Sequence, residues 1–380
     1  MAVDTVQPTV HVDLPKARNR RESQLGLMWR RFRQHKLALV SLWVVVFFYL
    51  VALLAEFIAP VDPVHYSARY TYAPPQGLHF VAQNADGGWE FGPYVNGYKT
   101  EIDPVALRRT FVIDEEVRIP VRFFAESEPY LLAGVIPLSV KLIGVENPRD
   151  PFYILGADRL GRDMLSRLIH GTRISLSIGL AGVTLSLFFG IVIGGFAGFY
   201  GGWFDSAVMR VVEFIRSMPT IPLWLGLAAA MPKDWSALQT YFAITLILSL
   251  IGWTELARVV RGRFLSLRTE DFVTAAQLDG ASDWRIVTRH MVPSFTSHII
   301  AAATLAIPGM ILAETALSFL GLGLQAPIVS WGTLLQDAQN IRTLATAPWL
   351  LAPGVCVVIV ILALNFFGDG LRDAADPHGR

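Results

Sequence analysis

Four charged side chains between positions 158 and 163 form the first group in the sequence that could do chemistry. Asp158 and Asp163 could act as a pair of carboxylates, and Arg159 and Arg162 could bind an anion. The group lies just before an uncharged run at 175–200. That position fits better an amphipathic helix at a membrane interface, in which these charges pair with one another. We therefore predict an interfacial helix here.

A single acidic residue, Glu314, interrupts an otherwise uncharged run at 299–324. Charged groups are costly inside a membrane, so an acid at such a position is a candidate functional residue. Glu314 could contact a transported solute, or it could make a structural hydrogen bond, and the residues alone leave both open. Pro219 and Pro222 predict a bent helix with freed backbone carbonyls, which could also line a path through the membrane.

Several kinds of chemistry are excluded by what the sequence lacks. No G-x-x-x-x-G-K-[ST] phosphate loop occurs, and none of the five lysines follows such glycines, so the chain cannot hydrolyse ATP by that route. His170, His290 and His298 are too dispersed for a metal site, and the single cysteine, Cys356, excludes an intramolecular disulfide. The net charge of +1 argues against a nucleic-acid partner. We expect a protein that is not an enzyme and binds no cofactor itself.

The composition indicates a membrane protein. Only 17% of the residues are charged and 53% are hydrophobic, whereas soluble domains average about 25% charged residues. A helix needs about 20 mainly apolar residues to cross the hydrocarbon layer. Six stretches meet this requirement or come close to it: 37–59, 175–200, 211–231, 241–254 extended back to Ala237, 299–324 and 349–368.

Basic residues are concentrated in two parts of the chain that six spans would leave on the same side. The leader at 1–36 carries eight of them, and its length and polarity argue against a cleaved signal peptide. The loop at 258–297 carries six arginines. The positive-inside rule places both parts in the cytoplasm, and the C-terminus returns there.

The segment at 60–173 separates the first two spans and is predicted to lie outside the cytoplasm. Its part at 66–126 mixes aromatic residues, Gly-Gly and Pro-Pro turns and alternating runs, which is typical of a small β-rich insert. The apolar stretch at 130–145 is too short to span a membrane and is interrupted by Pro137 and Lys141. We therefore place that stretch outside the membrane as well.

Small residues recur at every fourth position along the second apolar run and just beyond it. They form one stripe, which consists of Gly182, Ser186, Gly190, Gly194, Gly198 and Gly202. Such a stripe lets two helix backbones approach closely and gain dispersion contacts. Packing within this chain is the simpler interpretation, and an interface with another subunit or a sliding surface is the alternative.

The loop at 258–297 contains a predicted short helix. Glu270 and Asp271 suit a helix N-terminus, where the dipole favours acids, and Gly280 suits the residue after its end. Pro293 marks the return towards the next span. A short helix with small residues on one face is suited to docking in a groove of a soluble partner, although an ordinary loop would also fit.

The same stretch resembles the EAA loop of binding-protein-dependent ABC importers. That pattern consists of Glu-Ala-Ala, three residues, Gly, nine residues and Ile-x-Leu-Pro, and here Thr274 stands in place of the glutamate, with His290 and Val292 in place of Ile and Leu. The resemblance implies that the loop couples the chain to a partner ATPase. The residues that it implies for this coupling are Phe272, Thr274, Ala275, Ala276, Asp279, Gly280 and Pro293.

Two further segments resemble the C-type permease subunits of the dipeptide, oligopeptide and nickel importers. One reads LGADRLGRD at 155–163 and continues to GTRISL at 171–176. The other reads ETALSFLGLG at 314–323 and is followed by SWG at 330–332. With the glycine-rich span, the likeness covers roughly residue 155 to the C-terminus and also the N-terminal anchor. The insert at 60–150 is longer than the plain family pattern.

The resemblance implies an all-α polytopic protein with six transmembrane helices of the type I ABC importer (MetI-like) kind and a small β-rich extracytoplasmic insert. It implies a permease subunit of a bacterial inner membrane that forms half of a path for short peptides. ATP and Mg²⁺ would be used by two partner ATP-binding subunits. A second, B-type permease and an extracytoplasmic substrate-binding protein would complete the importer. Nickel chelates, glutathione-like compounds and oligosaccharides are alternative substrates, and a secondary transporter is the rival class.

The chain accordingly divides into five predicted parts. These are a cytoplasmic segment at 1–36, a first transmembrane helix at 37–59, the insert with its interfacial helix at 60–173, a permease core at 174–369 and a cytoplasmic tail at 370–380. Within the core, Gly190, Gly194, Gly198 and Gly202 would pack helices together. Glu314, Pro219 and Pro222 could line the translocation path.

Overall fold

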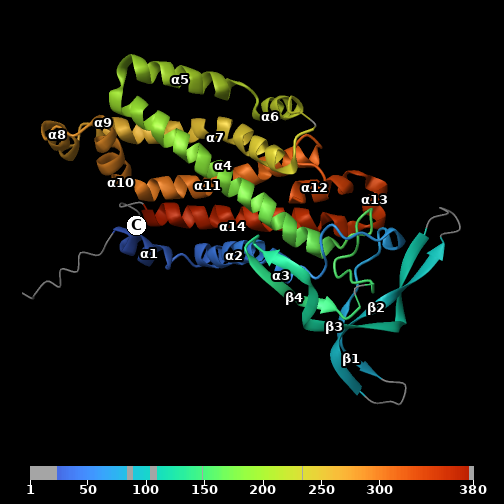
Figure 1. Ribbon diagram of the computed structural model, residues 1–380. Coiled ribbons are helices and arrows are strands. Elements are labelled where there is room, and N and C mark those ends of the chain that lie inside the picture. The colour runs from blue at the N-terminus through green and yellow to red at the C-terminus, as the bar shows by residue number, and fades with distance from the viewer. Residues whose placement is uncertain (1–23, 84–88, 103–108, 148, 233, 376–380) are drawn as a thin grey trace, which may run out of the picture.

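Helices dominate the protein, and one small sheet stands at one end of them (Figure 1). The structure is a computed structural model that describes residues 24–83, 89–102, 109–147, 149–232 and 234–375. Most of the predicted leader and the end of the predicted tail lie outside these residues. Within them, five segments are long and apolar enough to cross a membrane: α2 (Lys36–Leu53), α4 (Met164–Tyr200), α7 (Ala237–Leu267), α11 (Thr296–Phe319) and Pro348–Ala375, which contains α14 (Ala352–Ala375).

The predicted third span at 211–231 is not one helix. α5 (Gly202–Ser217) ends at its C-cap Met218, and the shorter apolar helix α6 (Thr220–Ala229) begins after Pro219. The ring of Pro219 disfavours helical geometry at the residue before it, and Met218 has an extended ψ of 139°. The expected kink is therefore a complete break, and Pro222 lies in the first turn of α6.

The segment between α2 and α4 contains a four-stranded antiparallel sheet in the order β1-β2-β3-β4. Its strands are β1 (Leu78–Gln83), β2 (Trp89–Ile102), β3 (Arg109–Leu132) and β4 (Ile136–Val145). β3 is the longest strand: its first half pairs with β2 and its second half pairs with β4. The apolar stretch at 130–145 forms the end of β3, a tight turn and β4, so it is a hairpin rather than a helix.

The interfacial helix predicted around Asp158 is absent, and this prediction is wrong. The chain from Gly156 to Asp163 forms a compact loop in which Gly156 and Gly161 have φ of +74° and +71°. At Gly161 a Cβ would stand 2.0 Å from the Ser67 carbonyl oxygen, so only glycine fits there. α4 then starts directly at Met164 and includes the residues that had been assigned to the interfacial segment.

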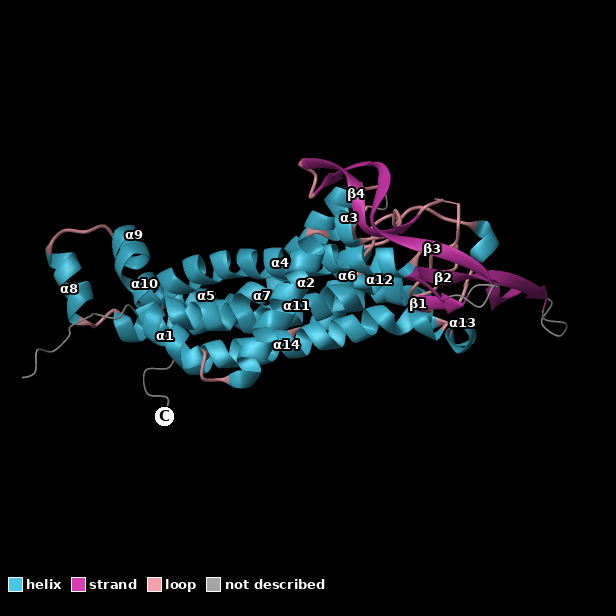
Figure 2. Ribbon diagram, turned by 90° about the horizontal axis from the view of Figure 1, so that it is seen from below, coloured by secondary structure: helices cyan, strands magenta, loops and turns pink. Residues whose placement is uncertain are grey.

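The two ends of the helical bundle are different (Figures 1 and 2). The sheet lies at one end, beside the short helix α3 (Ala55–Ile58). Several short helices lie at the other end, near the C-terminus of α14. These are α1 (Gln24–Phe32), α8 (Asp271–Leu278), α9 (Asp283–Arg285) and α10 (Val292–Ser294). The elements α12 (Trp331–Leu335) and α13 (Ile341–Thr346) connect α11 to α14 at the sheet end.

Within the bundle, the glycine stripe of α4 packs against α7. A Cβ on Gly190 would stand 2.7 Å from the Leu256 Cβ, and one on Gly198 would stand 2.7 Å from the Arg261 carbonyl oxygen. The stripe thus serves contacts inside this chain over most of its length. Gly202 does not belong to this packed stripe, because the chain turns at Gly201 and Gly202 is the first residue of α5. A Cβ on Gly202 would meet open space.

Candidate functional site

The short helix α8 stands at the end of the molecule that is remote from the sheet (Figure 1). Glu270 precedes it in extended conformation and Asp271 occupies its first turn, where the helix dipole stabilises acids. It ends at Asp279. Gly280 has φ +74°, and the next amide, that of Ala281, donates to the Ala276 carbonyl at 3.0 Å. This is a glycine-dependent helix end, as predicted for the loop.

One face of α8 packs on the protein and the other is open. Val273 and Ala276 are buried in a cluster that includes Ile286, Val287 and Met291 of the following π-helix. The exposed side chains are Asp271, Phe272, Thr274, Ala275, Gln277 and Leu278. Leu278 is 84% exposed, which is unusual for a large aliphatic residue on so short a helix. The fixed inner face holds the helix in place while its outer face stays available.

The predicted loop residues do not all lie on that outer face. Phe272, Thr274 and Ala275 do, whereas Ala276 is buried and fixes the helix to the protein. Pro293 lies in α10, immediately before α11 begins, as expected for a return towards a span. Asp279 and Gly280 are exposed at the end of α8. Leu278 was missed, although its place between the matched alanines and the matched glycine could have indicated it.

Glu314 is fully buried in α11 and joins three elements. Its carboxylate accepts hydrogen bonds from Ser175 of α4 at 3.2 Å, from Ser318 of α11 at 2.8 Å and from Ser330 before α12 at 2.8 Å. The Trp331 amide in turn donates to the Ser175 hydroxyl at 3.1 Å. The two motifs at 314–323 and 330–332 therefore meet at one carboxylate, near the sheet end of the bundle.

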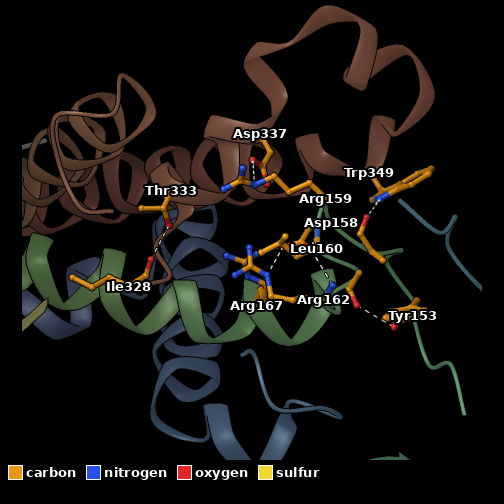
Figure 3. A network of polar contacts seen from close by, with 12 residues as sticks. Tyr153, Asp158, Arg159, Leu160, Arg162, Arg167, Ile328, Thr333, Asp337 and Trp349 are labelled. Atoms are coloured by element: carbon orange, nitrogen blue, oxygen red, sulfur yellow. Dashed lines mark hydrogen bonds and ion pairs between the residues drawn. The ribbon is translucent and has the colours of Figure 1, made fainter. Parts of the chain in front are cut away.

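The charged loop before α4 is a second polar network, shown in Figure 3. Asp158 is buried and accepts bonds from the Arg162 Nε at 2.7 Å and from the Arg167 guanidinium. The Leu160 amide also donates to it at 2.8 Å. A hydrogen bond of 2.9 Å from Trp349 Nε1 to the Ala157 carbonyl ties the loop to the start of the last span.

Asp158 and Asp163 have separate tasks and form no carboxylate pair. Asp163 is the N-cap of α4, where its carboxylate accepts from the Ser166 amide at 2.7 Å. Burial raises the pKa of Asp163 to about 6, against the opposing effect of the Ser166 hydrogen bonds. Arg159 pairs with Asp337 at 3.2 Å on the far side of the loop. Of the predicted pairing among the four charges, only Arg162 with Asp158 forms. That pair lies in a loop that leads into α4 rather than in a helix.

A charged group at membrane depth was missed by the sequence. Arg216 of α5 forms an ion pair with Glu255 of α7, and the two side chains are 37% and 62% exposed, respectively. A shallow surface pocket at this place is lined by Met209, Val212, Glu213, Arg216, Ser217 and Arg258. The predicted fourth span stopped at Thr254, which put Glu255 outside the membrane; the helix in fact continues to Leu267.

The depth of Glu255 follows from the helix packing. Its neighbour Leu256 lies against Gly190, well inside the uncharged run at 175–200 of α4. With a rise of 1.5 Å per residue, this run is about 38 Å long and exceeds the hydrocarbon thickness of about 30 Å, so Gly190 lies between about 7 and 15 Å inside the nearer edge of the layer. Charged side chains at such depth face water or protein rather than lipid. Pro219 and Pro222 are exposed at the adjacent break between α5 and α6.

No cluster of His, Cys, Asp or Glu side chains that could hold a metal ion occurs in the part of the chain that the structure describes. His170 instead contacts the Ser166 carbonyl at 2.9 Å, and His298 lies beside Arg263. Most of the predicted site residues accordingly fall into three groups: glycines at helix contacts, members of buried polar networks, and residues of the exposed helix α8.

The comparisons with known proteins agree with this arrangement. Residues 190–380 match the family described as "Binding-protein-dependent transport system inner membrane component", and residues 23–75 match the "N-terminal TM domain of oligopeptide transport permease C". The oligopeptide transport system permease protein OppC of Bacillus subtilis is 36% identical over 64% of this chain and 77% of its own length. The dipeptide transport system permease protein DppC of Alkalihalophilus pseudofirmus is 38% identical over 58% of this chain and 71% of its own length.

Another relative also spans the insert. The dipeptide transport system permease protein DppC of Lactococcus lactis is 31% identical over 92% of this chain and 89% of its own length. Among solved structures, the inward-facing MetNI methionine ABC transporter has a TM-score of 0.40 and 22% identity over 56% of this chain and 97% of that chain. On the family match over half of its length and on the OppC and DppC relatives, the chain belongs to the binding-protein-dependent transport system inner membrane components, as a multi-pass permease subunit of an ABC importer.

Proposed function

We propose that this permease subunit forms half of a translocation path for short peptides and that α8 connects it to an ATP-binding partner. The exposed outer face of α8 is the observation that carries the proposal. Leu278 and Phe272 are large apolar side chains that the chain itself leaves uncovered, on a helix whose other face is fixed by Val273 and Ala276. A groove in a soluble subunit would bury them.

The packed inner face of α8 suits the helix to transmit movement. Val273 and Ala276 share one apolar cluster with Val260 and Phe264 of α7 and with Ile299 at the start of α11. A displacement of α8 would therefore act on two membrane helices at once. Closure of two ATP-binding subunits around ATP and Mg²⁺ could switch the helices between two packed arrangements in this way.

The proposed topology has six crossings, with both termini and α8 in the cytoplasm and the sheet outside. Five crossings are the long apolar segments, and α5 with α6 would provide the remaining one. The basic residues of the leader and of the loop at 258–297 support this orientation. The five domain parts predicted from the sequence are kept under this proposal, except that no interfacial helix precedes α4 and that α4 begins at Met164, before the predicted start of the permease core.

The path itself is proposed to run along the α5–α7 side of the chain. Arg216 and Glu255 are exposed there at a depth where lipid would be a poor neighbour, and Pro219 and Pro222 free backbone groups beside them. A second, B-type permease facing this side would enclose the charges in an aqueous path. Glu314 lies away from it, in a network of three serines, and its proposed role is structural.

Short peptides are the proposed substrates because relatives are named as oligopeptide and dipeptide permeases. The remaining proposed partners are the two ATP-binding subunits and an extracytoplasmic binding protein that would dock at the sheet end. Nickel chelates, glutathione-like compounds and oligosaccharides are the alternatives. The binding protein would provide much of the selectivity.

Affinity purification of the chain from its native membrane in mild detergent tests this proposal. We expect ATP-binding subunits and a second multi-span permease to co-purify, and the complex in vesicles to take up peptides only with ATP. Recovery of the chain alone, with ATP-independent uptake in vesicles, would instead identify a secondary transporter.

A further inference from the structure

The hairpin formed by the end of β3 and by β4 carries an uncharged, largely exposed surface. The chain from Tyr130 to Val140 contains no charged residue. Val135 in its turn is 78% exposed, and Leu131 and Ile136 are each 54% exposed. Large apolar side chains on a β-turn in water are unfavourable, because such turns are normally built from polar residues and glycine. This surface therefore calls for a covering partner.

The hairpin turn lies beside the membrane boundary of the first span. The Ala133 amide in the turn donates to the Glu56 carboxylate at 3.4 Å, and Glu56 also pairs with Arg173. Glu56 and Lys36 bracket the uncharged part of α2 and α3. The two residues are 20 positions apart, which corresponds to about 30 Å of helix and to the thickness of the hydrocarbon layer. Arg173 likewise precedes the uncharged run of α4.

The apolar surface of the hairpin continues the outward face of α2. The side chains Val40, Trp43, Phe47 and Leu50 are exposed along one side of that helix. Phe57 of α3 continues the row, and its ring lies 6.3 Å from that of Phe124 on β3, which is itself 65% exposed. α3 contacts both β3 and β4. In Figures 1 and 2 the hairpin lies along α3 at the same end of the bundle.

We propose that the β3–β4 hairpin is a membrane-interface anchor, which places Leu131, Val135 and Ile136 among the lipids of the leaflet on the sheet side. Lipid is the occupant that fits, because the apolar surface is continuous with the lipid-facing row of α2 and starts at the level of the boundary pair Glu56–Arg173. The β3–β4 ladder pairs the facing backbone groups of the two strands. Their outer edges need water or lipid headgroups as hydrogen-bond partners, so the insertion is shallow and stays at the interface.

The consequence is mechanical. The sheet is joined to the helices through α3 and through the loop before α4, and an anchored hairpin would add a third attachment, to the bilayer itself. The part of the sheet made by β1, β2 and the start of β3 would then stand at a fixed tilt over the membrane. The inference depends on the membrane assignment of α2 and not on the substrate proposed above.

Depth-dependent fluorescence quenching tests the anchor. In a Cys356→Ala background, Val135→Cys provides one labelling site for an environment-sensitive dye, and the full chain with its co-purifying subunits is reconstituted in phosphatidylcholine vesicles. We expect blue-shifted emission that nitroxide on carbon 5 of the lipid chain quenches at least twofold, with weaker quenching from carbon 12 and none from aqueous iodide.

The matched control is Val112→Cys, an exposed valine near the opposite end of β3. Its dye should emit as in water and respond to iodide only. Ile136→Cys repeats the test on the same turn and should agree with Val135→Cys. Water-like emission at both turn positions would overturn the anchor. Blue-shifted emission without lipid quenching would also overturn it and would identify a protein, such as another subunit, as the covering partner.

Discussion

Gly194 of α4 lies directly against the backbone of Ala257 of α7: a Cβ on Gly194 would stand 2.4 Å from the Ala257 carbonyl oxygen and 2.7 Å from its Cα. Backbone atoms cannot move aside as a flexible side chain can. The contact therefore requires glycine, and it fixes the spacing of the two helices that connect the sheet end with α8.

Gly194→Ala should destabilise the protein by about 1–3 kcal/mol, the usual cost of forcing an extra group into a packed contact. Denaturant unfolding of the purified chain in detergent measures the change. Gly262→Ala is the matched control, because that glycine of α7 has open space at its Cβ position. The control should be neutral or slightly stabilising, since alanine has the higher helix propensity. Equal effects of the two variants would refute the close contact.

Substitution of Glu314 separates its two candidate roles. Glu314→Ala removes the acceptor of three buried hydroxyls and should cost about 1–3 kcal/mol of stability or more, visible as a lower unfolding temperature. Glu314→Gln keeps an oxygen acceptor and should retain most of the stability and of the uptake. A stable Glu314→Gln variant that has lost uptake would instead place the carboxylate on the substrate path.

Asp163 should make stability depend on pH below neutrality. Burial raises its pKa in the folded protein from 3.8 to about 6, so the folded state holds the proton where the unfolded state has lost it. Between about pH 4 and pH 6 the contribution of this residue to stability therefore falls as pH rises, and it is constant above. Unfolding temperatures measured across this interval should show the decrease.

Asp163→Asn is the matched variant for that pH dependence. Its side-chain oxygen can still accept from the Ser166 amide at the start of α4, but it carries no titratable proton. The natural protein loses the contribution of Asp163 as pH rises, whereas the variant does not. The unfolding temperature of the variant minus that of the natural protein should therefore increase from pH 4 to pH 6. Parallel curves would show that Asp163 does not titrate in this range.

Access of water to Glu255 tests the proposed path. In the Cys356→Ala background, Glu255→Cys should react with a charged thiol reagent from the aqueous phase, and the rate should change with ATP. Phe47→Cys is the control, because Phe47 is exposed on the middle of α2, where lipid should cover it. Equal protection of both positions would contradict an aqueous path beside Glu255.

The membrane spans and the end of α8 could be predicted because they rest on local signals. Uncharged runs gave the approximate place of five helices, and Gly280 at the end of a short amphipathic segment predicted a left-handed residue that the structure contains. The family resemblance was also carried by local motifs. Such signals need no knowledge of what lies far away in the chain.

The rest depended on contacts between distant residues. The loop at 156–163 could not be distinguished from a helix, because its shape is set by Ser67 against Gly161 and by Trp349 on Ala157. The role of Glu314 required the positions of Ser175 and Ser330. The partner of Glu255 became visible only when α5 was placed beside α7. From sequence alone, a charged residue such as Glu255 at the end of an apolar run indicates the edge of a membrane span. Only the position of its partner Arg216 shows that the two charges form a pair.

The most direct test of the account is ATP-driven peptide uptake by the reconstituted complex with Gly280→Asp compared with Gly280→Asn. Both side chains tolerate left-handed backbone and have the same size, and the open space at Gly280 would let either project from the end of α8. Normal amounts of both variants in the membrane, with uptake abolished only by the charge, is the predicted result. Full uptake with Gly280→Asp would contradict the role of α8 as the contact with the ATP-binding partner.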